Sequence, residues 1–129
     1  LAPDGTLGVV TWDGASRRLV LLERAPGATA FRRTTVTVCD GTSGLFLAWT
    51  PAGWIFVYDE VKPAPLGRWS WELAVLWPGP KAMGRAPYRR GVLSAADVPL
   101  AGLRGVVAGG SLYVLELRDG LRLLATPLP

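Results

Sequence analysis

Short apolar runs, separated by turns rich in proline and glycine, set the pattern of hydrophobic and polar positions along this chain. Alternation is clearest over 68–77, where apolar and polar side chains fall on opposite faces of an extended strand. One face carries Trp69, Trp71, Leu73, Val75 and Trp77, and the other carries Arg68, Ser70 and Glu72. The runs 19–22, 45–49 and 54–58 are apolar at every position, as in strands covered on both faces. The pattern predicts an all-β chain of antiparallel strands.

The C-terminal part of the chain predicts a β-hairpin. Residues 112–117 and 121–125 are both mostly apolar, and Asp119-Gly120 between them is a pair that favours a tight turn. Helical periodicity is nearly absent by contrast. The best helical candidate, 94–97, is too short for more than one turn before the next proline.

Proline turns recur at a regular interval. Pro3, Pro51 and Pro99 lie 48 residues apart, and each one precedes an apolar run. This spacing predicts a repeated β-rich unit, arranged either as one domain or as part of a larger array. The three predicted units are approximately 1–48, 49–96 and 97–129.

Two of these turns carry a more specific motif. Leu1-Ala2-Pro3-Asp4-Gly5 and Trp49-Thr50-Pro51-Ala52-Gly53 resemble the Trp-Ser-Pro-Asp-Gly junction of TolB-like and related WD40-type β-propeller repeats. The resemblance implies blades of four strands, in which aromatic and aliphatic side chains fill the space between neighbouring blades.

The number of units limits what such a chain can build. A propeller ring needs about four blades, whereas this chain supplies only about 2.5 to 3 propeller-like blade repeats at 48 residues each. We therefore expect part of a larger propeller, or a ring completed by other chains, because an open stack exposes apolar end faces. The alternative is a single compact β-sandwich or barrel.

Composition narrows the protein class further. The 129 residues include no His, Asn or Gln, one Cys and one Met, a depletion typical of heat-adapted proteins, and Arg far outnumbers Lys. These features predict a thermophilic bacterium with a GC-rich genome. The net charge of +4 is mild and the arginines are spread over all units, which argues against nucleic-acid binding. No apolar stretch reaches the ~18 residues of a membrane span, and the sequence leaves the compartment open.

The common catalytic constellations are missing from the sequence. Without histidine there is no Ser-His-Asp arrangement, Cys-His pair or histidine zinc site, and the single Cys39 cannot build a thiolate cluster. The neighbouring carboxylates Asp59 and Glu60 should point to opposite faces of a strand, and we interpret them as a solvated structural pair. The sequence therefore predicts no cofactor, no metal and no enzymatic activity.

Paired arginines are the most specific candidates for binding a partner. They occupy equivalent places in the first two units, with Arg122 in the corresponding place of the third. The loops 61–67 and 78–90 are also candidates for partner contacts, since repeat proteins place variable material in such insertions. The predicted partner-binding residues are Arg32, Arg33, Arg85, Tyr88, Arg89 and Arg90. The alternative is that these arginines block strand edges and form surface ion pairs.

These observations predict a non-enzymatic protein-interaction or structural module that binds a protein partner or associates with itself into an oligomer. One alternative is a carbohydrate-binding, lectin-like assembly, because the chain has six tryptophans and exposed indoles stack on sugars. The tryptophans of 68–77 are nevertheless expected to be mostly buried, given the aliphatic residues on their face. A second alternative is a non-catalytic part of a larger enzyme.

Overall fold

The computed structural model describes residues 1–79 and 88–129, which form ten β-strands and one short 3-10 turn, η1 (Pro65–Gly67). The strands are β1 (Leu7–Asp13), β2 (Arg18–Arg24), β3 (Arg32–Val38), β4 (Thr42–Thr50), β5 (Gly53–Ala64), β6 (Arg68–Pro78), β7 (Tyr88–Ala96), β8 (Gly102–Ala108), β9 (Ser111–Leu117) and β10 (Leu121–Pro127). The prediction of an all-β chain is confirmed.

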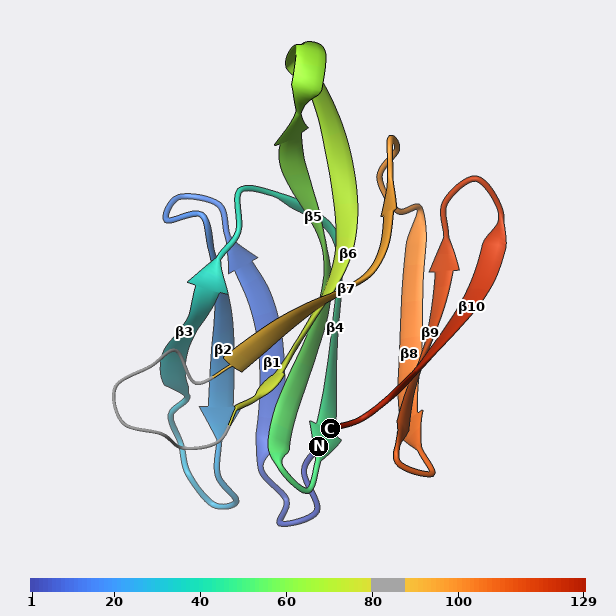
Figure 1. Ribbon diagram of the computed structural model, residues 1–129. Helices are drawn as coiled ribbons and strands as arrows, with labels where there is room; N and C mark the ends of the chain where they lie inside the picture. The colour runs from blue at the N-terminus through green and yellow to red at the C-terminus, as the bar shows by residue number, and fades with distance from the viewer. Residues whose placement is uncertain (80–87) are drawn as a thin grey trace.

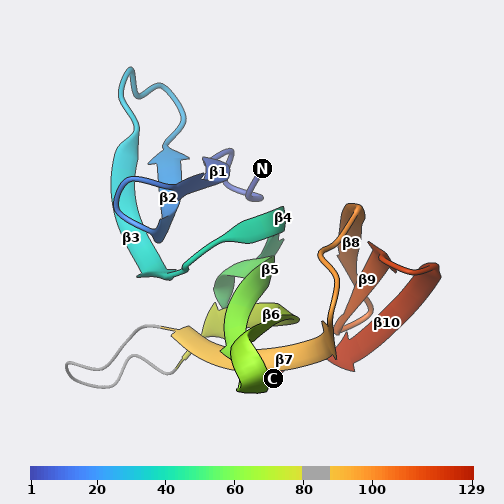
Figure 2. The same ribbon diagram turned by 90° about the horizontal axis from the view of Figure 1, so that it is seen from above.

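These strands form three separate antiparallel sheets, in each of which the strand order follows the sequence. We call them sheet A (β1-β2-β3), sheet B (β4-β5-β6-β7) and sheet C (β8-β9-β10). Sheet B lies between the other two (Figure 1). Strand β4 packs beside both β1 and β8, and from these three strands the sheets spread outward without closing on one another (Figure 2).

Sheet B is covered on both faces because its central strands are apolar in both phases of their alternation. In β5, Phe56 and Tyr58 pack in a cluster with sheet A, whereas Ile55 and Val57 pack in a second cluster with sheet C. All residues from Trp54 to Glu60 are buried. The expectation that 54–58 is a strand between two layers is therefore confirmed.

The 48-residue interval does not mark the same position in each sheet. The turns at Pro3 and Pro99 precede the first strands of sheets A and C, whereas the turn at Pro51 precedes the second strand of sheet B. The turn at Pro51 joins two strands of one sheet, whereas the turn at Pro99 lies between sheets B and C. The predicted unit boundary at 48/49 accordingly falls inside β4, because similar turn sequences serve two kinds of connection.

Cross-strand pairing overrides three local predictions. The predicted loop 61–67 is shorter than expected, since β5 continues to Ala64 and pairs with the start of β6. The best helical candidate, 94–97, forms no helical turn, because Ser94 to Ala96 pair with β6.

Residues 88–90 of the other predicted loop begin β7, and its residues 80–87 lie outside the described part of the chain. The predicted C-terminal hairpin is confirmed, with Leu117 opposite Leu121.

Candidate interaction surface

The face of sheet C that points away from sheet B exposes a row of large apolar side chains, and we call it the outer face of sheet C. The alternation of β9 creates it: Leu112, Val114 and Glu116 are buried, whereas the residues between them are exposed. The exposed fractions range from 37% to 67% for Val106, Tyr113, Leu115, Leu117, Leu121 and Leu123.

The strand register gathers these side chains into one patch. Leu115 lies opposite Leu123 in β10, Leu117 lies opposite Leu121, and Tyr113 lies opposite Val106 in β8. Two shallow hollows of about 220 and 310 Å³ follow the patch. Arg104 is the charged residue of this patch, and its Nη1 donates to the carbonyl of Leu103 at 2.8 Å.

This face has the chemistry of an interior surface. The residues of β9 are apolar in both phases, as in β5, but sheet B covers only one side of β9 within the described residues. A strand with that pattern is normally buried on both faces. Contiguous exposed apolar patches of this kind mark interaction sites in soluble proteins.

Polar groups cover the centre of the outer face of sheet A instead, whereas Val9 and Val38 at its margins are 40% and 62% exposed. Arg33 in β3 donates to Asp13 in β1 at 2.7 Å, and this ion pair spans β2, which lies between those strands. Val20 of β2 lies on the same face, between Thr11 and Thr35, and is only 1% exposed. The apolar centre of sheet A is thus covered by the chain itself.

The Asp13–Arg33 ion pair has a titration signature. The hydrogen bond from Arg33, assisted by Ser16, lowers the pKa of Asp13 from 3.8 to about 2. Because the folded-state pKa is depressed, the stability that this pair contributes is present above pH 3.8 and is lost as the pH falls through about 2. We expect carboxyl-detected NMR to find Asp13 titrating near 2, and Arg33→Gln to return its pKa towards 3.8. Arg32→Gln is the matched control, since Arg32 pairs with Glu23; titration of Asp13 near 3.8 in the unaltered chain would contradict this account.

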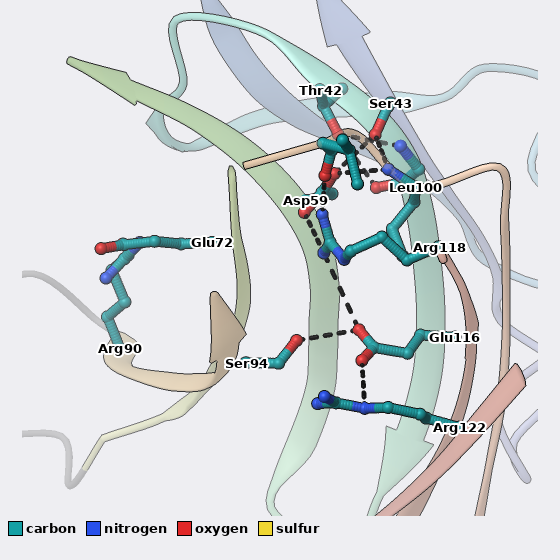
Figure 3. Close-up of polar contacts among 12 residues, drawn as sticks. Thr42, Ser43, Asp59, Glu72, Arg90, Ser94, Leu100, Glu116, Arg118 and Arg122 are labelled. Carbon is teal, nitrogen blue, oxygen red and sulfur yellow. Dashed lines mark hydrogen bonds and ion pairs between the residues drawn. The ribbon is translucent and has the colours of Figure 1, made fainter. Parts of the chain in front are cut away.

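Buried ionic contacts hold sheet C against sheet B (Figure 3). Asp59 of β5 is fully buried, and its Oδ1 accepts a hydrogen bond from Arg118 Nη2 at 3.0 Å. Its Oδ2 accepts from Ser43 Oγ at 2.6 Å and from the backbone N–H of Leu100 at 3.1 Å. Arg118, in the β9–β10 turn, also donates to the carbonyl of Val98. One end of sheet C is therefore tied to β5 in sheet B.

A second carboxylate extends this contact. Glu116 is 2% exposed and accepts from Ser94 Oγ of β7 at 2.8 Å. Arg122 Nε lies 2.9 Å from the other oxygen of Glu116, and Arg118 lies 3.7 Å from Glu116 (Figure 3). Sheet C thus presents its outer face from a fixed position.

Asp59 and Glu60 point to opposite faces, as predicted, but they are buried and not solvated. Asp59 faces sheet C, whereas Glu60, 3% exposed, lies on the side of sheet A and forms ion pairs with Lys62 at 3.0 Å and Arg90 at 3.1 Å. Nearby Cys39 is buried, and burial together with the charge of Glu60 raises the pKa of its thiol to about 11. The prediction of a solvated pair is wrong, because the neighbouring sheets cover both faces of β5.

Those predicted partner-binding arginines that the structure describes lie on outer edge strands, mostly in ion pairs. Arg32 contacts Glu23 at 2.6 Å. Arg90 contacts Glu72 at 2.7 Å. Arg122 makes the corresponding contact in sheet C. The last strand of each sheet thus pairs an arginine with a carboxylate of the strand before it, the geometry of the edge-blocking alternative.

The remaining predicted residues have different surroundings. Tyr88 is half-buried edge-to-face against Phe56, with ring centroids 5.1 Å apart, and burial raises its pKa. Arg89 makes no ion pair with the described residues and lines a pocket between sheets B and C. Arg85 lies outside the described residues. The five candidates that the structure describes are thus divided between sheets A and B, and the role of all six in partner binding stays a prediction.

The tryptophans are not all buried. Trp54 is 5% exposed, and Trp12, Trp49 and Trp77 pack against the two clusters, but Trp69 is 60% exposed. The expected burial of Trp69 is wrong, because the β5–β6 hairpin extends beyond the neighbouring sheets (Figure 1).

No protein-family model, curated protein or solved structure matches this chain. Among the described residues, no helix has the length and apolar character needed to cross a bilayer. Within 1–79 and 88–129 there is also no group of three side chains from His, Cys, Asp and Glu placed to hold a metal ion. The outer face of sheet C is the strongest functional feature of the part described.

The sequence predicted apolar faces at the ends of an open stack, but it did not identify the residues that form the outer face of sheet C. The signal was present in β9, where Leu112 to Leu117 is apolar at all positions except Glu116. A similar run in β5 predicted a strand covered on both faces. The same reasoning applied to β9 identifies the residues of the outer face of sheet C.

Proposed function

We propose that this chain is a non-enzymatic structural and interaction module whose outer face of sheet C binds another antiparallel β-sheet. The observation that carries this proposal is the patch of six large, exposed apolar side chains on a sheet whose opposite face packs against sheet B. Sheets with alternating aliphatic side chains pack face to face about 10 Å apart. Sheets A and C already cover sheet B in this way. We expect the partner sheet to cover the outer face of sheet C in the same way.

The module is best interpreted as consecutive blades of a β-propeller. Three features support this reading: each sheet is a meander in sequence order, β1, β4 and β8 lie side by side, and the sheets spread outward from them (Figure 2). In a propeller, every blade is covered by its neighbours on both faces. A partner sheet on the outer face of sheet C continues the same arrangement.

In a solution of this chain alone, the available antiparallel sheet belongs to a second copy. We expect concentration-dependent self-association by sedimentation equilibrium, and at least a tenfold weaker association for Leu115→Lys, because a lysine in an apolar interface buries an unpaired charge. The melting temperature should change little, since Leu115 points away from sheet B.

Leu66→Lys is the matched control for that experiment, because Leu66 is 92% exposed at the tip of the β5–β6 hairpin. It should associate like the unaltered chain. A chain that stays monomeric at high concentration, or one whose association is the same with and without Leu115→Lys, would exclude the proposed surface.

Carbohydrate binding is a second candidate, favoured by the exposed indole of Trp69 near the tip of the β5–β6 hairpin. Exposed tryptophans provide flat apolar faces on which sugar rings stack. On a glycan array, binding that disappears with Trp69→Ala and persists with Leu115→Lys would support this function. Absence of binding, or binding unaffected by Trp69→Ala, would remove it.

A further inference from the structure

A pocket separate from the outer face of sheet C opens between sheets B and C. It has a volume of about 420 Å³, within the ~300 to 1,000 Å³ typical of small-molecule sites. It lies between the β4–β5 turn and the β8–β9 turn, which share the lower end of the molecule in Figure 1. The lining residues used below are Thr50, Ile55, Trp77, Arg89 and Leu128.

The pocket combines an apolar interior with one cation. Ile55, Trp77 and Leu128 provide apolar surface, and Arg89 is the one charged side chain among the described residues that line it. Arg89 makes no hydrogen bond or ion pair with the rest of the described chain, unlike its neighbour Arg90. The hydroxyl of Thr50 is already engaged, since it donates to the carbonyl of Gly53 at 2.8 Å. The guanidinium of Arg89 therefore sets the preference of the pocket for charge.

Backbone pairing fixes the relative positions of the indole and the guanidinium. Trp77 in β6 lies directly opposite Arg89 in β7, so both side chains leave sheet B on the same face. The indole lies against Gly91, where an added Cβ would come within 2.9 Å of Trp77 Cη2. Glycine at this position thus leaves space for the ring beside Arg89.

We propose that this pocket binds a small anionic ligand with an aromatic or aliphatic body, such as an aryl carboxylate. The carboxylate pairs with Arg89, and the apolar body lies against Trp77 and Ile55. Arginine favours carboxylates because its fork of N–H donors matches their two oxygens. An aryl ring against the indole adds stacking to apolar burial.

The test uses 2-naphthoate and its neutral analogue 2-naphthalenemethanol with the full chain. We expect naphthoate to shift the indole N–H signal of Trp77, identified by its loss in Trp77→Phe, with a Kd of about 1 mM or below. Arg89→Gln should weaken naphthoate binding about tenfold and leave binding of the alcohol unchanged. Arg122→Gln, in the ion pair with Glu116 on sheet C, is the matched control and should bind naphthoate like the unaltered chain.

Several results would overturn the proposal. These are no saturable shift of Trp77, equal affinity for naphthoate and the alcohol, or naphthoate binding unaffected by Arg89→Gln. Shifts confined to the methyl groups of Leu115 and Leu123 would also overturn it, because they would place the ligand on the outer face of sheet C. Leu115→Lys should retain naphthoate binding, so the pocket and the association surface can succeed or fail separately.

Discussion

Asp59→Ala is expected to lower the free energy of unfolding by about 3–5 kcal/mol, because it leaves a buried arginine without its carboxylate. The side chain of Arg118 is 7% exposed, and its Nη2 lies 3.0 Å from Asp59 Oδ1. The hydroxyl of Ser43 loses its acceptor in the same substitution, whereas the backbone N–H of Leu100 keeps Ser43 Oγ, at 3.1 Å, as its second acceptor. Urea unfolding followed by tryptophan fluorescence measures the loss.

A second variant separates the uncompensated charge from the lost hydrogen bonds. Adding Arg118→Met to Asp59→Ala removes the stranded cation, so we expect a large part of the stability to return. The remaining deficit reflects the hydroxyl of Ser43, which loses Asp59, and the carbonyl of Val98, which loses Arg118. Asp40→Ala is the control, because Asp40 forms an exposed ion pair with Arg17 and should leave the unfolding midpoint nearly unchanged. A loss below about 1 kcal/mol for Asp59→Ala would show that this contact does not hold sheet C in place.

Replacing either of two glycines that pack against aromatic rings is expected to give the next largest loss of stability. A Cβ at Gly8 in β1 would lie 2.5 Å from Cζ2 of buried Trp54, and a Cβ at Gly105 in β8 would lie 2.8 Å from Cε1 of Phe46. Trp54 has little freedom to move, because its Nε1 donates to Glu23 at 3.0 Å. Gly8→Ala and Gly105→Ala should each destabilise the chain by about 1–3 kcal/mol through overpacking.

The control for this pair is Gly120→Ala. No atom beyond its chain neighbours lies within 4 Å of a Cβ at Gly120. Its unfolding midpoint should match that of the unaltered chain, whereas Gly8→Ala and Gly105→Ala should unfold at clearly lower urea concentrations. If all three variants unfold together, the close packing of sheets A and C on sheet B is not as described.

The strands were the part of the fold that the sequence could predict. A buried strand such as 54–58 is marked by its own apolar residues and by the turn residues that flank it, so the local sequence is enough to locate it. The ends of β5 and β7 were not predictable, because pairing with β6 keeps Pro63 and Ser94 extended against their local preferences. Local signals extend over a few residues, whereas these pairings join distant ones.

The assignment of strands to sheets lay beyond the sequence for a related reason. The turns at Pro51 and Pro99 look alike, but the first connects strands within sheet B and the second lies between two sheets. Which connection forms depends on packing across the sheets, including the contact of Arg118 with Asp59. That contact joins residues 59 positions apart, and no local pattern marks it.

The candidate surfaces were likewise predictable only in part from the local sequence. The described arginines lie on edge strands, as in the edge-blocking alternative, but their carboxylate partners come from the register of neighbouring strands, as for Arg32 and Glu23. The outer face of sheet C needed both the alternation of β9 and the knowledge that sheet B covers only one of its faces. The pocket beside Arg89 depends on two sheets and was not visible in the sequence.

The most direct measurement is the solvent accessibility of leucine methyl groups by NMR with a soluble nitroxide, over a range of protein concentrations. If the outer face of sheet C binds another sheet, the methyl signals of Leu115, Leu117 and Leu123 broaden in dilute solution and become protected at high concentration. Leu66, at the tip of the hairpin, remains broadened throughout. Methyl groups of the outer face that stay equally broadened at every concentration would contradict the account.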